Sequence, residues 1–528
     1  MNNSSKKSYI SNILKCTLFC LICGSIVGLV IFFFKFAASK IEYVSRYLYN
    51  ITKGNALLII LVFIVLIGLA ILMYILHKKI PETKGGGIPR SEGVLRGILP
   101  LKSIRTFLGT IVGSFISYFA GLPLGTEGPS VIIGTSIGDV TSKTSKKNKA
   151  LDRYIKTGGA AAGFAVATGA PLSGVLFSLE EIHKRFTPML VIAVSVATIA
   201  ATLVNNVLCH IFGLDPRLFD FSVFSSFELK HIGYLVLLAL LIGLMVGLFD
   251  KTLERVNKFT SKNKKFFHPL AKLISAFVIT GILAYVFSDA VYSGHHLVEE
   301  MIVNNRTVWF LLGLLVVRLL MMFLLTDSNA TGGIFIPVLA IASVIGAIFG
   351  KILLLIGLEE EFFPVIVILT ICAFIGGTLR APFTSAVLFL ELTFSFTDLF
   401  YVIVVIFIVN VITEMFNQPS FYDRALEKME EEHNEGKEAK IAHFKVQISD
   451  DAFVVGKAVR DIMWPYSSVV VSIKRHKEDF HDTDNDGEKK LYEYDTIVLR
   501  CRYFDEEEIR GTIKELVGNT FEIEKIEI

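Results

Sequence analysis

The stretch Gly125-Thr126-Glu127-Gly128-Pro129-Ser130 interrupts a long apolar part of the sequence. It places the carboxylate of Glu127 between two glycines, at the expected start of a helix over residues 129–138. Proline is favoured in the first turn of a helix, and glycine lets the backbone approach a ligand closely. Because an ionisable residue at membrane depth is costly, it usually marks a path for ions or protons. Glu127 is therefore the leading candidate for a functional residue.

The composition indicates a polytopic α-helical membrane protein. Hydrophobic residues make up 53% of the 528 residues, and 43 residues are phenylalanine. A membrane-spanning helix needs about 20 largely apolar residues. Several of the apolar segments are too short or too interrupted to span alone, which predicts broken or re-entrant helices. The candidate segments are 13–37, 56–76, 103–119, 189–211, 232–248, 274–287, 307–325, 335–356, 363–379, 381–394 and 399–415.

The placement of charge is more informative than the net charge of +3. Basic clusters at 143–156 and 251–272, with Lys6 and Lys7, predict the cytoplasmic side by the positive-inside rule. Ordinary solvated loops would agree with this pattern. We expect an integral protein of the cell membrane with both termini in the cytoplasm, its first apolar segment retained as a helix rather than cleaved as a signal peptide.

Other chemistries find little support in the sequence. The six cysteines show no metal-ligand spacing, so buried reduced thiols are expected. There is no GxxxxGK phosphate-binding motif and no nucleophile-base-acid set, so we expect neither an ATP-driven pump nor an enzyme, and no cofactor, metal or nucleic-acid partner. The cysteines are Cys16, Cys20, Cys23, Cys209, Cys372 and Cys501.

Two internal similarities predict a repeated architecture. The stretch 170–182 starts Ala-Pro and reaches Leu-Glu after a hydroxyl residue and an apolar run, and the stretch 381–391 does the same at equal spacing. Gly128-Pro129 has a counterpart in Ile336-Pro337, which follows Gly332-Gly333. Repeats that flank interrupted helices are typical of secondary transporters, whose binding site lies near the midplane.

A second glycine-rich break, Gly85-Gly86-Gly87-Ile88-Pro89, precedes a short predicted helix. Its amides could face an anion, or it could be a plain loop. Glu92 on that helix could carry protons or pair with a nearby arginine, and we favour pairing.

The soluble tail begins after the apolar segments end. We expect a membrane domain over 1–426, a charged linker over 427–441 and a small α+β domain over 442–528. The patterns predict strands at 445–448, 468–473, 495–503 and 521–528, and helices at 453–463 and 506–517. Residues 482–487 with Glu493 fit a calcium-binding loop, but an acidic hairpin turn is the favoured interpretation.

Three broken-helix motifs in order, Gly-Gly-Gly-Ile-Pro, Gly-Thr-Glu-Gly-Pro and Gly-Gly-Ile-Phe-Ile-Pro, followed by Pro-Ser-Phe-Tyr at 419–422, resemble the CLC family of chloride channels and proton/chloride exchangers. The resemblance implies an all-α polytopic membrane protein with broken and re-entrant helices in two inverted repeats, assembled as a homodimer with one pathway per subunit. It implies a gating role for Glu127 and proton transfer by Glu181, although Glu181 could instead pair with Lys184 or Arg185. The implied anion-binding residues are Gly86, Gly87, Ile88, Gly333, Ile334, Phe335 and Tyr422.

The sequence departs from this family pattern at two positions. Gly86 stands where the family usually has serine, which leaves the choice of anion open, and Thr126 stands where it has a basic residue. We expect exchange of chloride, or a similar small anion, for protons. A passive channel, or an exchanger for another anion such as fluoride or nitrate, is the alternative. The tail resembles the TrkA-C (RCK-C) domain, which implies dimerisation and a small regulatory ligand.

Overall fold

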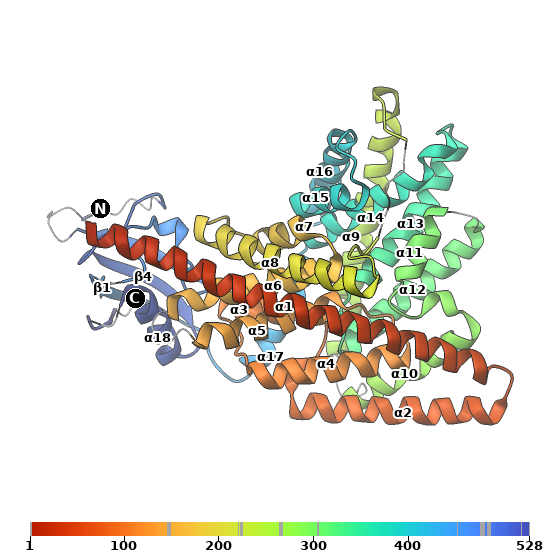
Figure 1. Cartoon of the computed structure of the whole chain (residues 1–528), viewed down its shortest axis with the longest axis horizontal. Coiled ribbons are helices and arrows are strands. Elements are labelled where there is room, and N and C mark those ends of the chain that lie inside the picture. Colours follow the sequence, from red (N-terminus) through yellow and green to blue (C-terminus); the bar gives the residue numbers. More distant parts are fainter. Residues whose placement is uncertain are drawn as a thin grey trace.

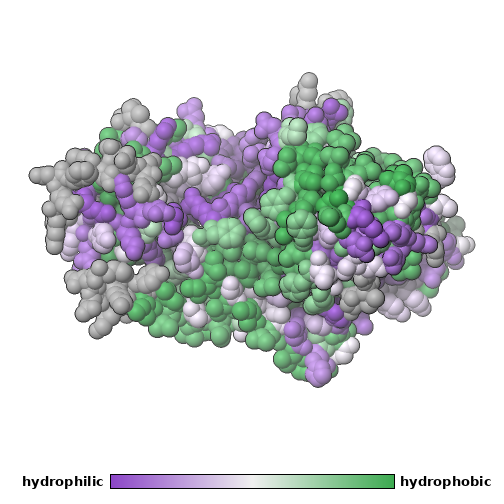
Figure 2. Space-filling model, turned by 90° about the horizontal axis from the view of Figure 1, so that it is seen from above, coloured by the Kyte–Doolittle hydropathy of each residue, from purple (hydrophilic) through white to green (hydrophobic). Residues whose placement is uncertain are grey.

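The computed structural model describes residues 3–144, 149–219, 221, 225–262, 268–303, 306–450, 452–475, 481–482, 487–518 and 520–526. It is mostly helical, and among the described residues eight helices are long and apolar enough to cross a membrane. The chain is an integral membrane protein. Figure 2 shows a broad hydrophobic surface over the helical part and hydrophilic side chains toward the tail. The helices are α1 (Asn3–Thr52), α2 (Ala56–Lys79), α3 (Ile88–Arg96), α4 (Ser103–Ala120), α5 (Glu127–Thr144), α6 (Asp152–Thr168), α7 (Pro171–Phe177), α8 (Pro188–Phe212), α9 (Ile232–Lys262), α10 (Pro269–Val286), α11 (His295–Val303), α12 (Val308–Ser328), α13 (Phe335–Leu355), α14 (Phe363–Leu379), α15 (Pro382–Thr393), α16 (Leu399–Met415), α17 (Phe421–His433) and α18 (Glu506–Val517).

The helices repeat their pattern of neighbours in two halves, α1–α8 and α9–α16. In the first half α5 packs on α6 and α1 packs on α8; in the second half α13 packs on α14 and α9 packs on α16. The repeated architecture predicted from the sequence is thus present. The breaks are also present, since α3, α7 and α11 have nine, seven and nine residues, too few to span a bilayer.

The two halves cap each other's helices. Glu180, in a π-helical turn over Ser178–Ile182, accepts hydrogen bonds from the Phe383 and Thr384 backbone N–H groups at the start of α15. Glu391 accepts the equivalent bonds from the Leu172 and Ser173 N–H groups at the start of α7. The first N–H groups of a helix have no partner within the helix, and a carboxylate there also meets the positive end of the helix dipole. These two carboxylates therefore tie the halves together.

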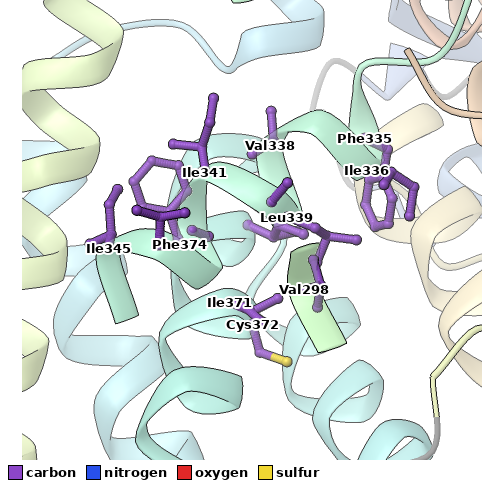
Figure 3. Close-up of a cluster of buried hydrophobic side chains, with 14 of the residues drawn as sticks. Val298, Phe335, Ile336, Val338, Leu339, Ile341, Ile345, Ile371, Cys372 and Phe374 are labelled. Carbon is purple, nitrogen blue, oxygen red and sulfur yellow. The ribbon is translucent and has the colours of Figure 1, made fainter. Parts of the chain in front are cut away.

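The centre of the second half is a dry hydrophobic cluster built from α11, α13 and α14 (Figure 3). Ile341 and Ile345 from α13 lie near Phe374 from α14, and Val298 from α11 lies near Leu339. Helix α14 is buried along almost its whole length. This packing fixes α13, whose first residue is Phe335, against the rest of the membrane domain.

The tail folds as an antiparallel five-stranded sheet with helix α18. The strand order is β3-β2-β4-β1-β5, with bounds β1 (Lys440–Gln447), β2 (Ser468–Lys474), β3 (His481–Asp482), β4 (Thr496–Tyr503) and β5 (Glu524–Ile526). The predicted helix over 453–463 is wrong. That segment forms turns and one short 3-10 helix, because Gly456 takes a left-handed φ of 81° and the backbone pairs with 487–491 instead.

Two further expectations for the tail concern the charged linker and the candidate calcium-binding stretch. The expected charged linker is helical as far as His433, because α17 begins at Phe421 and packs along α3. The candidate calcium-binding stretch spans residues 482–487 with Glu493, and its residues 483–486 lie outside the described residues.

The tail packs directly against the membrane domain. Buried side chains from α1, α6, α8 and the tail form one hydrophobic cluster, and α1 runs from the tail along the helical part (Figure 1). Arg153 at the start of α6 donates to the Met463 and Trp464 carbonyls, and the Tyr154 ring lies 5.9 Å from the Phe453 ring. Burial in this interface holds the pKa of Lys457 well below its usual range.

Candidate functional site

The three glycine-rich breaks, far apart in sequence, meet at one point in the structure. Gly125 and Gly333 form an isolated antiparallel bridge, with N···O distances of 2.6 and 2.8 Å. The Gly85 N–H donates to the Asn329 carbonyl at 2.9 Å, which joins the first break to the third. The starts of α3, α5 and α13 are therefore held together by backbone hydrogen bonds.

Glycine is required for this approach at two positions. A Cβ atom on Gly128 would lie 1.6 Å from the Gly86 carbonyl oxygen. Gly87, the N-cap residue of α3, has a left-handed φ of 81° and would place a Cβ 2.3 Å from the Gly128 carbonyl oxygen. Such distances exclude any side chain. The predicted anion-binding backbone at Gly87, Ile88, Gly333 and Ile334 thus lies around a single junction.

Glu127 lies at this junction and is only 1% exposed. The Thr126 hydroxyl donates to one carboxylate oxygen at 3.2 Å, and the backbone N–H of Ile336, in the first turn of α13, interacts electrostatically with the carboxylate. The other oxygen has no hydrogen-bond partner among the described residues. The carboxylate therefore occupies a position at the α13 N-terminus that suits a small anion. Helix α5 begins at Glu127 itself, two residues earlier than expected.

Lys35 on α1 is a charged neighbour of Glu127 that the sequence reasoning missed. Its ammonium donates to the Val166 carbonyl at 2.8 Å, in the last turn of α6, and interacts electrostatically with Glu127. A lysine inside an apolar segment was the available signal. The 92-residue separation gave no reason to connect it with Glu127, because only the fold brings α1 beside α5.

Glu181 lies deeper in the protein and is fully buried. One carboxylate oxygen accepts a hydrogen bond from the Ser420 hydroxyl at 3.2 Å, and the other has no partner among the described residues. The considered partner Lys184 instead forms an ion pair with Asp423. Glu92 pairs with Arg96 at 2.7 Å, as favoured from the sequence. Glu181 is thus a buried carboxylate that forms no ion pair with any residue that the structure describes.

An aromatic series connects the Glu127 junction with Glu181. Phe335 meets Phe164 edge-on at 5.2 Å, Phe164 stacks on Phe177 at 4.3 Å, and Phe177 meets Tyr422 edge-on at 6.3 Å. Tyr422 is 1% exposed and interacts electrostatically with Glu127 and Glu181. The predicted site residues from both halves are therefore brought together, and Tyr422 interacts electrostatically with both carboxylates.

The environment of Gly86 shows what the missing serine changes. A Cβ atom here would lie 3.7 Å from the Gly332 carbonyl oxygen and from the Ile334 side chain, which is ordinary contact. A serine would therefore fit. Its absence removes one hydroxyl donor from the junction without a steric cause.

Comparisons with known proteins give a consistent result. The model of the family described as "Voltage gated chloride channel" matches residues 67–414. The "H(+)/Cl(-) exchange transporter ClcA" of Citrobacter koseri is 29% identical over 384 residues, covering 70% of this chain and 79% of the relative. The same-named protein of Salmonella arizonae is 29% identical over 381 residues, with coverage of 70% and 79%.

Solved structures share the fold. The structure of "a slow cyanobacterial Cl-/H+ antiporter" has a TM-score of 0.73 at 27% identity and covers 79% of this chain and 99% of its own. That of "a eukaryotic CLC transporter" has a TM-score of 0.65 at 19% identity, with coverage of 80% and 75%, and shows the fold alone.

Proposed function

Because this chain belongs to the voltage gated chloride channel family, we propose that it is a secondary antiporter exchanging chloride, or a similar small anion, for protons. One observation carries the proposal: the Gly125–Gly333 bridge holds the buried Glu127 carboxylate beside the first turn of α13, where an anion would bind. A carboxylate and an anion cannot share that position, since like charges repel in a low-dielectric site. The relatives named as proton/chloride exchangers support the same activity.

The geometry supports a simple coupling scheme. Protonation neutralises Glu127 and lets its side chain leave the α13 N-terminus, so that an anion can take its place. Backbone N–H groups hold the anion without a full positive charge that would trap it. Glu181 exchanges protons from the opposite side, and Tyr422 closes the anion position there. The uptake or release of a proton by Glu127 is thereby coupled to the movement of an anion through the site.

Reconstitution into liposomes tests the proposal. When no proton gradient is present at the start, an imposed chloride gradient should drive protons across the membrane. Glu127→Gln should abolish this proton movement while chloride flux continues. Glu391→Gln, which removes the charge of a carboxylate that instead caps α7, is the matched control and should retain coupling. Chloride flux without proton movement in the wild-type protein would establish a passive channel instead. Replacing chloride with fluoride or nitrate in the same assay identifies the preferred anion.

The assembly and the tail extend this proposal. We propose a homodimer in the cell membrane with both termini cytoplasmic and one pathway per subunit. The large apolar side chains exposed on α8, α15 and α16 support a protein partner or lipid on that face. We also propose that the tail is a TrkA-C-like regulatory domain, supported by its sheet-and-helix fold and by its direct contact with α6.

A further inference from the structure

A basic cavity lies along α17 beside the first glycine-rich break. Two adjoining cavities of about 430 and 450 Å³ share Lys84, Asn329, Lys428 and Glu432 in their walls. Each is far larger than a monatomic anion requires and falls within the range of small-molecule sites. The described lining of neither cavity includes Tyr422, Glu127 or Glu181, the three side chains assigned to the exchange pathway.

The walls of the first cavity present an excess of cationic donors. Five are lysine or arginine: Lys84, Arg90, Lys102, Arg424 and Lys428. Two carboxylates, Glu82 and Glu432, oppose them. Arg424 also forms an ion pair with the buried Asp250, at 3.9 Å, and the terminal nitrogens of both arginines donate to backbone carbonyls. The buried Nε atoms of Arg90 and Arg424, however, have no hydrogen-bond partner among the described residues. Buried guanidinium donors without acceptors are costly, and phosphate oxygens are acceptors that match their geometry.

We propose that this cavity binds a multivalent, phosphate-bearing anion. Five cations around one cavity suit several negative charges better than one, and arginine with lysine is the usual pairing for phosphate. A ligand in this cavity would contact residues next to the proposed transport site. Lys84 directly precedes Gly85, and Lys428 lies on α17, whose first turn carries Tyr422. A bound ligand would therefore hold α17 against the first break.

Binding is measured on the full-length protein in detergent at constant ionic strength, with pyrophosphate as the probe. Pyrophosphate should bind the wild-type protein with measurable heat. The double variant Arg90→Gln with Lys428→Gln should bind it at least about tenfold more weakly, because it lacks two of the charged contacts. Lys474→Gln, an exposed lysine on β2, is the control and should bind normally. Thermal melting curves confirm that each variant is folded.

A second arm distinguishes a soluble ligand from a lipid headgroup. The protein is placed in nanodiscs of phosphatidylcholine with or without phosphatidylglycerol, and thermal stability is compared. Stabilisation by phosphatidylglycerol that depends on Arg90 and Lys428, without heat from pyrophosphate, identifies a headgroup as the ligand. Neither response, or responses equal in the double variant and the wild type, would overturn the proposal.

A different observation concerns Lys35 and rests on the proposed exchange function. The resemblance expects a basic residue next to Glu127, but Thr126 stands there. Lys35 instead reaches this region from α1, held by the Val166 carbonyl, and interacts electrostatically with Glu127. We infer that Lys35 is a positioning residue that supplies, from another helix, the positive charge missing at position 126.

The pH profile of proton-coupled chloride uptake tests this inference. Lys35→Met should shift the midpoint to higher pH by about one unit, because a nearby cation favours the charged carboxylate. Adding Thr126→Arg to Lys35→Met should move the midpoint back, which a purely structural role would not do. Lys40→Met, on the same helix beside Phe36, is the control. An unchanged midpoint in Lys35→Met would overturn the inference, whereas a wild-type protein without proton coupling would refute the proposed function itself.

Discussion

The two halves of the membrane domain share a scaffold but differ in the residues at equivalent positions. Glu180 and Glu391 occupy the same place in the repeat, and each caps a helix of the other half. One residue further, Glu181 corresponds to Leu392. Counting back from the paired prolines, Glu127 corresponds to Phe335. The carboxylates that cap helices of the opposite half are thus duplicated, whereas the two that we propose for proton transfer, Glu127 and Glu181, have no carboxylate counterpart in the second half.

This difference separates two uses of a buried carboxylate. Glu180 and Glu391 are each satisfied by two backbone N–H groups and one hydroxyl, from Thr384 and Ser173 respectively. Glu127 and Glu181 each retain an oxygen without a partner among the described residues. A carboxylate whose two oxygens both accept hydrogen bonds is fixed in place by them, while one with an unbonded oxygen is less constrained and can take up a proton there. Substitutions at equivalent positions of the two halves should therefore have different effects on transport and on stability.

Gly128→Ala should have the largest effect, because the junction admits no side chain there. Its Cβ would lie 1.6 Å from the Gly86 carbonyl oxygen, while the equivalent residue of the second half, Ile336, is an ordinary buried side chain. We expect a loss of about 3 kcal/mol or more in unfolding free energy, and loss of transport. Ile336→Val should cost only about 1 kcal/mol. Denaturation in detergent measures both, and equal losses would contradict the role of Gly128.

Glu181→Gln should reduce proton movement by about tenfold or more while the fold is retained, since general acid–base groups contribute at least that factor. The neighbouring Glu180→Gln should behave in the opposite way, with the ratio of protons to chloride preserved and stability reduced. Both are measured by paired proton and chloride flux in liposomes and by thermal melting. Proton loss in Glu180→Gln with intact melting would reverse the assignment of the two residues.

Glu180→Gln and Glu391→Gln should destabilise the protein by similar amounts, about 1–3 kcal/mol each, because each removes charge-assisted bonds to a helix start. Thermal or chemical unfolding of the two single variants measures this. A large difference between them would show that the repeat symmetry does not extend to its energetics.

Gly86→Ser should have the smallest effect on stability, within about 0.5 kcal/mol, since its side chain meets only ordinary contacts. It restores a hydroxyl donor to the junction, and we expect a changed order of preference among chloride, nitrate and fluoride. Competition between these anions in flux measurements tests it. An unchanged order would mean that the residue at position 86 does not set selectivity in this protein.

Much of the membrane domain could be predicted because its signals are local. Long apolar runs place α2, α12, α13 and α14 within a few residues of their observed bounds. Glycine marks the breaks because it lacks a Cβ atom and permits close backbone approach, and proline marks them because it is favoured in the first turn of a helix. The reciprocal caps of Glu180 and Glu391, and the approach of Lys35 to Glu127, were not predicted. These contacts depend on tertiary packing between segments that share no local pattern.

The tail shows where local patterns mislead. Residues 453–463 read as a helix by composition, yet Gly456 and pairing with 487–491 produce turns. The interface with α6 had no signal at all, since Tyr154 and Phe453 look like ordinary buried aromatics in isolation. Tertiary contacts override propensity at such positions.

The contact between Arg153 and the Met463 carbonyl spans 310 residues of sequence. During synthesis, α1 and α6 are made before the tail. The surface of these helices that the tail covers therefore stays uncovered until synthesis ends. Contacts of such long separation form slowly. Release from the ribosome, rather than insertion of the final helix, would then be the step that lets the earliest helices reach their final packing.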